Sequence, residues 1–154
     1  MKVAIGQDSH RIDFEKSDKK LVLGAVTFEG ERPLLANSDG DVVLHAITNA
    51  VSGITCKNIL GKVADKMCEN GITDSKEYLK EALKYLKENI VHLSISVECK
   101  TPKLADKMEL MRESIAKIMN INASQIGITA TSGEGLTESG KGNGISVIAI
   151  ITVE

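Results

Sequence analysis

The sequence predicts an α+β protein, a two-layer sandwich in which helices cover one face of a mixed four- or five-stranded sheet. Segments with alternating apolar residues, typical of strands, are interleaved with segments whose apolar residues recur every three or four positions, typical of helices. Their order is strands, helix, helix, strand, helix, strand, strand, without an internal repeat or a linker. We therefore expect one domain spanning residues 1–154.

Five segments are predicted to be strands: residues 3–12, 21–28, 93–99, 126–131 and 145–153. Gly6 in the first is expected at a bulge or at a point of close approach, and Gly24 is expected to bend the second. The third strand carries its apolar residues on odd positions only, which is typical of a half-buried strand. The last strand is apolar on both faces, so it needs cover on both.

Three helices are predicted. The first runs from about Gly40 to Ser52, with Ser38 or Asp39 as its N-cap. The second follows a cap at Asp74 or Ser75, and its apolar stripe extends to Ile90. The third is expected to begin at Thr101-Pro102, with the threonine as cap and the proline in the first turn. Residues 62–73 have weak periodicity and several charges, and we interpret them as a mobile flap.

The composition excludes several classes of function. The net charge is -2, and the acidic and basic residues are mixed along the chain, unlike those of a nucleic-acid-binding tail or a basic membrane patch. No apolar run reaches the roughly 18 residues of a membrane span, and the N-terminus lacks the apolar region of a signal peptide. The three cysteines are widely spaced, as expected of free thiols in a reducing compartment. We expect a cytoplasmic protein without a nucleic-acid or membrane partner.

A metal site is the main functional hypothesis from the residue pattern. Asp41, His45 and Asn49 are spaced by four and should form a polar stripe on an otherwise apolar helix. On an extended strand, Asp8 and His10 point the same way, with Cα atoms roughly 7 Å apart. Together with His45 they would provide three ligands for zinc and leave a fourth position open, the pattern of catalytic zinc. Chance spacing of these residue types is the alternative.

Residues 132–144 form a glycine-rich loop with two open interpretations. Its backbone N–H groups, its hydroxyls and Lys141 could wrap a phosphate, or the loop could be a long hairpin with residues in the left-handed region. Glu134 in this loop could bind a hard divalent cation or be an ordinary surface residue. Lys100 and Lys103, around Thr101-Pro102, indicate either an anion site or a solvated turn.

Several motifs in their order along the chain resemble one enzyme family. They are Gly6-Gln7-Asp8-Ser9-His10-Arg11, Ser38-Asp39-Gly40-Asp41-Val42-Val43-Leu44-His45-Ala46, Thr101-Pro102-Lys103-Leu104, Ala130-Thr131-Ser132-Gly133-Glu134 and Gly140-Lys141-Gly142-Asn143-Gly144-Ile145. Over nearly the whole chain, the sequence resembles the 2-C-methyl-D-erythritol 2,4-cyclodiphosphate synthases of non-mevalonate isoprenoid biosynthesis. The resemblance implies a homotrimer with active sites between subunits. It also implies a lyase reaction, in which the 2-phosphate of CDP-methylerythritol 2-phosphate attacks the β-phosphate and expels CMP.

The resemblance also implies roles for individual residues. Asp8, His10 and His45 match the ligands of a zinc ion that binds the β-phosphate, and Glu134 matches the ligand of a magnesium or manganese ion that bridges the α- and β-phosphates. Asn37 and Ser132 occupy catalytic positions beside the reacting phosphates. The positions that match substrate-binding residues are Asp8, Ser9, His10, Asn37, Ser38, Asn58, Lys100, Thr101, Pro102, Lys103, Thr131, Ser132 and Lys141.

The chain also departs from the family pattern. Asn37 stands where the family usually has a histidine, Asn58 where an aspartate contacts the substrate diol, and Glu138 where an aromatic residue usually lies. Lys141 replaces an arginine, and residues 63–67 lack the family's Phe-Pro-acidic segment. Two hypotheses follow: a divergent synthase, or a zinc-binding trimeric paralogue that binds or acts on another phosphorylated ligand. A structural trimer without activity is a third, but it would not need the three metal ligands.

Overall fold

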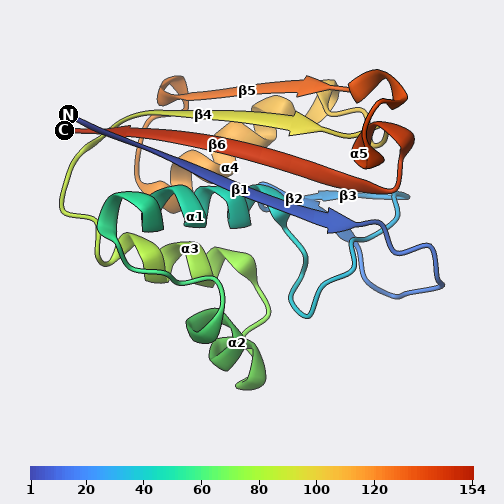
Figure 1. Cartoon of the computed structure of the whole chain (residues 1–154), viewed down its shortest axis with the longest axis horizontal. Coiled ribbons are helices and arrows are strands. Elements are labelled where there is room, and N and C mark those ends of the chain that lie inside the picture. Colours follow the sequence, from blue (N-terminus) through green and yellow to red (C-terminus); the bar gives the residue numbers. More distant parts are fainter.

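The computed structural model describes residues 1–154 and shows an α+β sandwich built on one mixed four-stranded sheet (Figure 1). The strands are β1 (Lys2–Arg11), β4 (Ile90–Glu98), β5 (Ile126–Thr131) and β6 (Gly144–Val153), in the spatial order β1-β6-β4-β5. Strand β6 is antiparallel to both β1 and β4, whereas β5 is parallel to β4. The predicted fold class and mixed sheet are therefore confirmed.

Helices cover one face of this sheet (Figure 1). The α-helices are α1 (Val42–Thr55), α2 (Lys62–Glu69), α3 (Ser75–Leu83), α4 (Met108–Met119) and α5 (Glu138–Lys141), and the short 3-10 turns are η1 (Ala105–Lys107), η2 (Ala123–Gln125) and η3 (Gly133–Gly135). Helix α1 contacts β1 and β6, helix α4 contacts β5, and α3 packs against both of these helices. None of the helices has the length and apolar character needed to cross a membrane.

Helix α1 lies unusually close to β1. A Cβ atom added at Gly6 would be 2.1 Å from the carbonyl oxygen of Ala46 and 2.3 Å from the backbone nitrogen of Ala50. Glycine is therefore required there for steric reasons, and the predicted close approach is confirmed. Because side chains alternate along a strand, Asp8 and His10 share the face of Gly6 and project toward the same helix.

The other face of the sheet is uncovered in a single chain. Strand β6 buries its odd-numbered residues in the core, from Ile145 to Val153. On its opposite face Ile148 and Ile150 are 40% and 41% exposed, and they pair with Gln7 and Ile5 of β1. Val3 and Ile5 on the same face are more than 60% exposed. The expectation that the last strand is apolar on both faces is confirmed, and only one face is covered within the chain.

The predicted strand over residues 21–28 is wrong. It forms two short antiparallel strands, β2 (Leu21–Leu23) and β3 (Val26–Phe28), in a separate two-stranded sheet. Gly24 and Ala25 have φ values of 59° and 61°, the left-handed conformations that a two-residue hairpin turn requires. An alanine at the second turn position is uncommon, so the sequence indicated a bend instead of a hairpin.

The carboxylate of Asp41 stabilises this unusual turn. Its two oxygens accept hydrogen bonds from the backbone N–H groups of Gly24 (2.9 Å) and Ala25 (2.7 Å). One of the oxygens also accepts from the N–H of Leu44 at 3.0 Å, so Asp41 is the N-cap of α1. The expected cap at Ser38 or Asp39 is therefore wrong. Burial raises the pKa of Asp41 to about 6, against the lowering effect of these N–H groups.

Two further segments differ from expectation. Residues 62–73, interpreted as a flap, contain helix α2, which packs Ala64 into the core. The helix expected from Thr101-Pro102 begins at Met108, after the turn η1. Pro102 is buried beyond the end of β4, where the N–H of Lys100 donates to the carbonyl of Ser139, so this segment is held against the glycine-rich loop. The predicted cap at Asp74 of α3 is confirmed.

The hairpin interpretation of residues 132–144 is also wrong. Strands β5 and β6 are not neighbours, because β4 lies between them. The loop crosses from the edge of the sheet to its interior and contains η3 and α5. Gly142 of this loop has a φ of 95°, a left-handed conformation that favours glycine, and it ends α5.

The contact between Gly6 and α1 predicts a large effect of substitution. Changing Gly6→Ala should lower the free energy of unfolding by about 3 kcal/mol, the upper end of the usual cost of overpacking, because the new methyl group meets backbone atoms that cannot move independently. Urea unfolding monitored by circular dichroism measures this. Gly127→Ala is the control, since its Cβ would have no neighbour nearer than 3.7 Å. Equal stability of the two variants would contradict the steric argument.

Candidate metal centre and pocket

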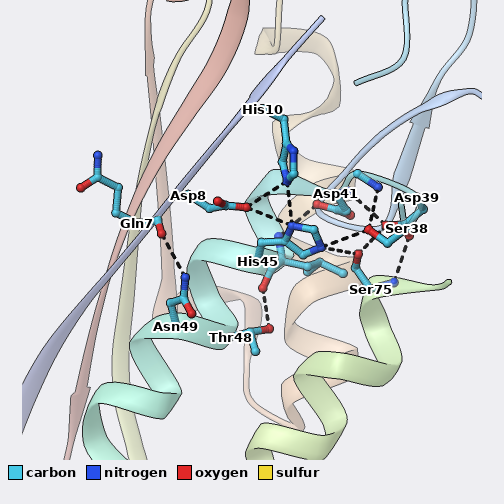
Figure 2. Close-up of polar contacts among 12 residues, drawn as sticks. Gln7, Asp8, His10, Ser38, Asp39, Asp41, His45, Thr48, Asn49 and Ser75 are labelled. Atoms are coloured by element: carbon cyan, nitrogen blue, oxygen red, sulfur yellow. Dashed lines mark hydrogen bonds and ion pairs between the residues drawn. The ribbon is translucent and has the colours of Figure 1, made fainter. Parts of the chain in front are cut away.

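Three side chains converge beside the C-terminal half of β1 (Figure 2). The Nε2 atom of His10 lies 3.1 Å from Oδ2 of Asp8, and Nδ1 of His45 lies 3.0 Å from the same oxygen. The two ring nitrogens are 3.1 Å apart. The predicted ligand set is therefore brought together, and these atoms form a nearly equilateral triangle.

The secondary structure places each of these ligands. Asp8 and His10 are two residues apart on β1 and project from one face. His45 lies in the first turn of α1, where its backbone N–H donates to the carbonyl of Asp41. One turn later, the side-chain amide of Asn49 donates to the carbonyl of Gln7 at 3.0 Å. The predicted polar stripe therefore has three separate roles: Asp41 caps the helix, His45 joins the cluster and Asn49 joins the helix to β1.

The electrostatics of the cluster favour a cation. Burial would raise the pKa of Asp8, but hydrogen bonds from His10 and His45 together hold that pKa well below its usual range. The pKa of His10 is raised, first by its hydrogen bond with Asp8. Asp8 is thus an anion at neutral pH, half-buried between two imidazoles that share its oxygen. A metal ion would replace the protons that these rings otherwise supply.

The geometry fits a tetrahedral zinc site. Zinc binds histidine nitrogens and carboxylate oxygens at about 2.0–2.2 Å, so ligand atoms of a tetrahedral site lie roughly 3.3 Å apart. The distances of 3.0–3.1 Å among Asp8, His10 and His45 need only a small expansion. Nδ1 of His10 lies 3.0 Å from the carbonyl oxygen of Leu35, to which it donates, so the lone pair of Nε2 is directed at the centre. Three protein ligands leave one position for an exogenous oxygen.

The cluster lies in the wall of a cavity of about 610 Å³. Asn37 and Ser38 form one side of it, and α2 with the residue before it forms another, through Gly61, Ala64, Asp65 and Cys68. The thiol of Cys68 donates to the carbonyl of Asn37 at 3.3 Å and so joins the two sides. Asp65 is not among the predicted site residues, because the weak periodicity of residues 62–73 indicates a flap and not a helix with a face toward the cavity. The spacing of Ala64 and Cys68 by four was the available signal for that helix face.

Several other predicted site residues lie outside this cavity. Asn58 is exposed and is not part of the cavity wall. Ser9 pairs with Ser146, Ser146 with Glu98, and Glu98 with Thr131, so these residues form one row across the sheet. Because Ser9 alternates with Asp8 and His10 on β1, this row projects from the open face of the sheet, away from the cluster.

The remaining predicted residues gather at the ends of β4 and β5. Lys100, Thr101 and Lys103 are exposed, and Thr101 and Pro102 border a second cavity of about 270 Å³. The hydroxyl of Ser132 donates to Glu134 at 3.2 Å. Lys141 forms an ion pair of 3.1 Å with Glu138, and both groups are exposed. Glu134 does not belong to the metal-ligand cluster of this chain.

Fold and site together define a small α+β protein with an open His-His-carboxylate centre at the edge of its sheet. The chain belongs to the YgbB family, whose sequence model matches residues 1–154. It is 50% identical over 155 residues to the 2-C-methyl-D-erythritol 2,4-cyclodiphosphate synthase of Chlamydia caviae, an alignment that covers 99% of this chain and 88% of that protein. The corresponding synthase of Chlamydia trachomatis serovar D is 47% identical, with 99% and 87% covered.

Solved structures agree with this assignment. The chain is similar to the IspF protein of Plasmodium falciparum, solved as a CDP complex, with a TM-score of 0.84 and 25% identity over 98% of this chain and 94% of that one. It also matches the bifunctional IspDF of Campylobacter jejuni, with a TM-score of 0.82 and 26% identity over 97% of this chain and 41% of that one. The resemblance inferred from the sequence motifs is therefore confirmed.

We expect the purified protein to bind about one zinc ion per chain, because Asp8, His10 and His45 form one three-ligand site. His45→Ala should lose most of this zinc, since two ligands remain. Elemental analysis after gel filtration measures the content. His92→Ala is the matched control, because His92 is the one other histidine and lies on β4. Full zinc content in His45→Ala would refute the assignment.

Proposed function

We propose that this chain is a 2-C-methyl-D-erythritol 2,4-cyclodiphosphate synthase, which converts CDP-methylerythritol 2-phosphate to the cyclic diphosphate and CMP. The observation that carries the proposal is the three-ligand centre, with one open position, in the wall of a cavity of about 610 Å³. The full-length similarity to named synthases at 50% identity favours this function over a paralogue with another phosphorylated ligand.

The reaction that we propose is an intramolecular phosphoryl transfer. An oxygen of the 2-phosphate forms a bond to the β-phosphorus, the bond from that phosphorus to the bridging oxygen breaks, and CMP leaves with the bond electrons. Such a transfer depends mainly on positioning and on neutralising the phosphate charge. Zn²⁺ held by Asp8, His10 and His45 would supply a Lewis acid for the β-phosphate.

The polar residues of the cavity have proposed roles around this reaction. Asn37 and Ser38 lie beside the metal ligands, where the amide of Asn37 can donate to a phosphate oxygen. Asp65, on the opposite wall, is a carboxylate that can accept hydrogen bonds from substrate hydroxyls. A neutral amide gives a weaker hydrogen bond than a charged imidazolium would give at the same place.

The second half of the proposed site requires another copy of the chain. Thr131 lies on the strand at the opposite edge of the sheet from Asp8, three strand spacings or roughly 14 Å away, and on the opposite face. A single chain therefore cannot present Thr131, Ser132 and Glu134 to a substrate bound at its own metal centre. We propose a homotrimer with sites between subunits, in which the neighbour supplies the nucleotide-binding residues and Glu134 binds Mg²⁺ or Mn²⁺.

The open face of the sheet supports this assembly. Val3, Ile5, Ile148 and Ile150 form an apolar patch of neighbouring residues on β1 and β6. Burial of apolar surface in water stabilises an interface by roughly 25 cal/mol per Å². We propose that a second copy covers this patch.

The function is tested by incubating the zinc-loaded protein with CDP-methylerythritol 2-phosphate and measuring CMP and the cyclic diphosphate. We expect both products in equal amounts. Asn37→His should raise turnover roughly tenfold to a thousandfold, because one hydrogen-bond donor at a developing charge is worth up to ~4 kcal/mol and a charged donor gives a stronger bond than a neutral amide. Asn89→His, at the far end of the sheet, is the control. Absence of CMP from wild type and from Asn37→His would exclude the synthase function.

The assembly is tested by light scattering at micromolar concentration, where we expect a trimer. Ile150→Lys should dissociate it, because a charge would be placed in the centre of the apolar patch. Leu110→Lys is the control, since Leu110 on α4 is 51% exposed, compared with 41% for Ile150. A monomeric wild type, or equal dissociation by both variants, would contradict the proposed interface.

A further inference from the structure

The outer nitrogen of His45 contacts a buried serine, which is in turn paired with a half-buried carboxylate, and the proposed reaction uses neither. Nε2 of His45 lies 2.8 Å from the hydroxyl of Ser75, the first residue of α3 (Figure 2). Ser75 is fully buried, and its hydroxyl donates a hydrogen bond to the carboxylate of Asp39. The hydroxyl of Ser38 is farther from the same nitrogen, at 3.5 Å.

The direction of these hydrogen bonds determines the state of the imidazole. An ionised carboxylate only accepts hydrogen bonds, so the single hydroxyl proton of Ser75 is donated to Asp39. The oxygen of Ser75 can then interact with Nε2 of His45 only as an acceptor, which places a proton on Nε2. In the neutral form that a metal ligand must adopt, the ring consequently has its lone pair on Nδ1, the atom directed at Asp8 and His10, and the metal takes the place of the proton that Nδ1 otherwise donates to Asp8.

Asp39 itself is held in place by the backbone. Its carboxylate also accepts from the N–H of Ser75 at 3.1 Å and from the N–H of Asp41 at 3.1 Å. Its own N–H donates to the carbonyl of Thr73 at 2.9 Å. The carboxylate therefore joins the start of α1 to the start of α3 and leaves Ser75 little freedom to reorient.

We propose that Asp39 and Ser75 are positioning residues that hold His45 in its metal-binding tautomer and thereby set the affinity of the centre for zinc. The inference deepens the proposed metal site and rests on it. Outer partners of metal-bound histidines typically contribute 10- to 100-fold in metal affinity, because they fix both ring orientation and tautomer. Helix α3 would then affect the reaction through a ligand that it supports, without contacting the substrate.

The test measures the zinc dissociation constant by competition with a chromophoric chelator. Ser75→Ala should weaken zinc binding 10- to 100-fold, because Nε2 loses its acceptor. Asp39→Asn should weaken it about tenfold, since an amide can donate to Ser75 and so permits the opposite tautomer. The double variant should be no weaker than Ser75→Ala, because both residues act through one hydrogen bond to His45.

Asp74→Ala is the matched control. Asp74 precedes Ser75 and caps the same helix by accepting from the N–H of Lys76 at 2.9 Å, but it does not contact His45. It should lower the thermal stability of the metal-free chain and leave the zinc dissociation constant within about twofold of wild type. Wild-type zinc affinity in both Ser75→Ala and Asp39→Asn would overturn the inference, as would an equal loss in Asp74→Ala. A wild type that binds no zinc would instead refute the metal site itself.

Discussion

The close contact between α1 and β1 is the constraint on which the rest of the structure depends. It requires a residue without a side chain at Gly6, where the backbone of α1 occupies the space of a Cβ atom. Asn49 reinforces the contact through its hydrogen bond to the carbonyl of Gln7. At this separation the first turn of α1 places Nδ1 of His45 3.0 Å from the carboxylate of Asp8. A packing requirement between two elements thus determines the geometry of the centre.

Two neighbouring carboxylates, Asp39 and Asp41, organise the start of α1 in different ways. Asp41 is completely buried, and its oxygens are used by three backbone N–H groups, two of which belong to the β2–β3 hairpin. Asp39 connects the same loop to α3 through Ser75. Burying a carboxylate is costly unless hydrogen bonds compensate for lost water, and the raised pKa of Asp41 is the sign of that cost. Asp41 and Asp39 together fix the start of α1 and thereby the position of His45 in its first turn.

The sheet divides the proposed site between its two faces. The helix-covered face carries Asp8 and His10, whereas the row from Ser9 to Thr131 lies on the open face. This division follows from the alternation of side chains along a strand and holds for any protein with this register. It explains why Asp8 and Ser9, although adjacent in sequence, project from opposite faces of the sheet. Assembly is consequently part of the proposed chemistry and not only a source of stability.

The sequence by itself determined the fold class, the strands of the main sheet and the candidate metal ligands. Alternation and helical periodicity are local, and the pattern of Asp8 and His10 on a strand with His45 on a helix was sufficient to indicate the centre. Tertiary structure alone decided the features that depend on contacts between distant residues. The hairpin at Gly24 and Ala25 is stabilised by Asp41, the segment after Pro102 is held against the glycine-rich loop, and α2 becomes a wall of the cavity because Ala64 reaches the core. Ser75 appeared only as a candidate cap, and its contact with His45 has no local signal, because 30 residues separate the two in the chain.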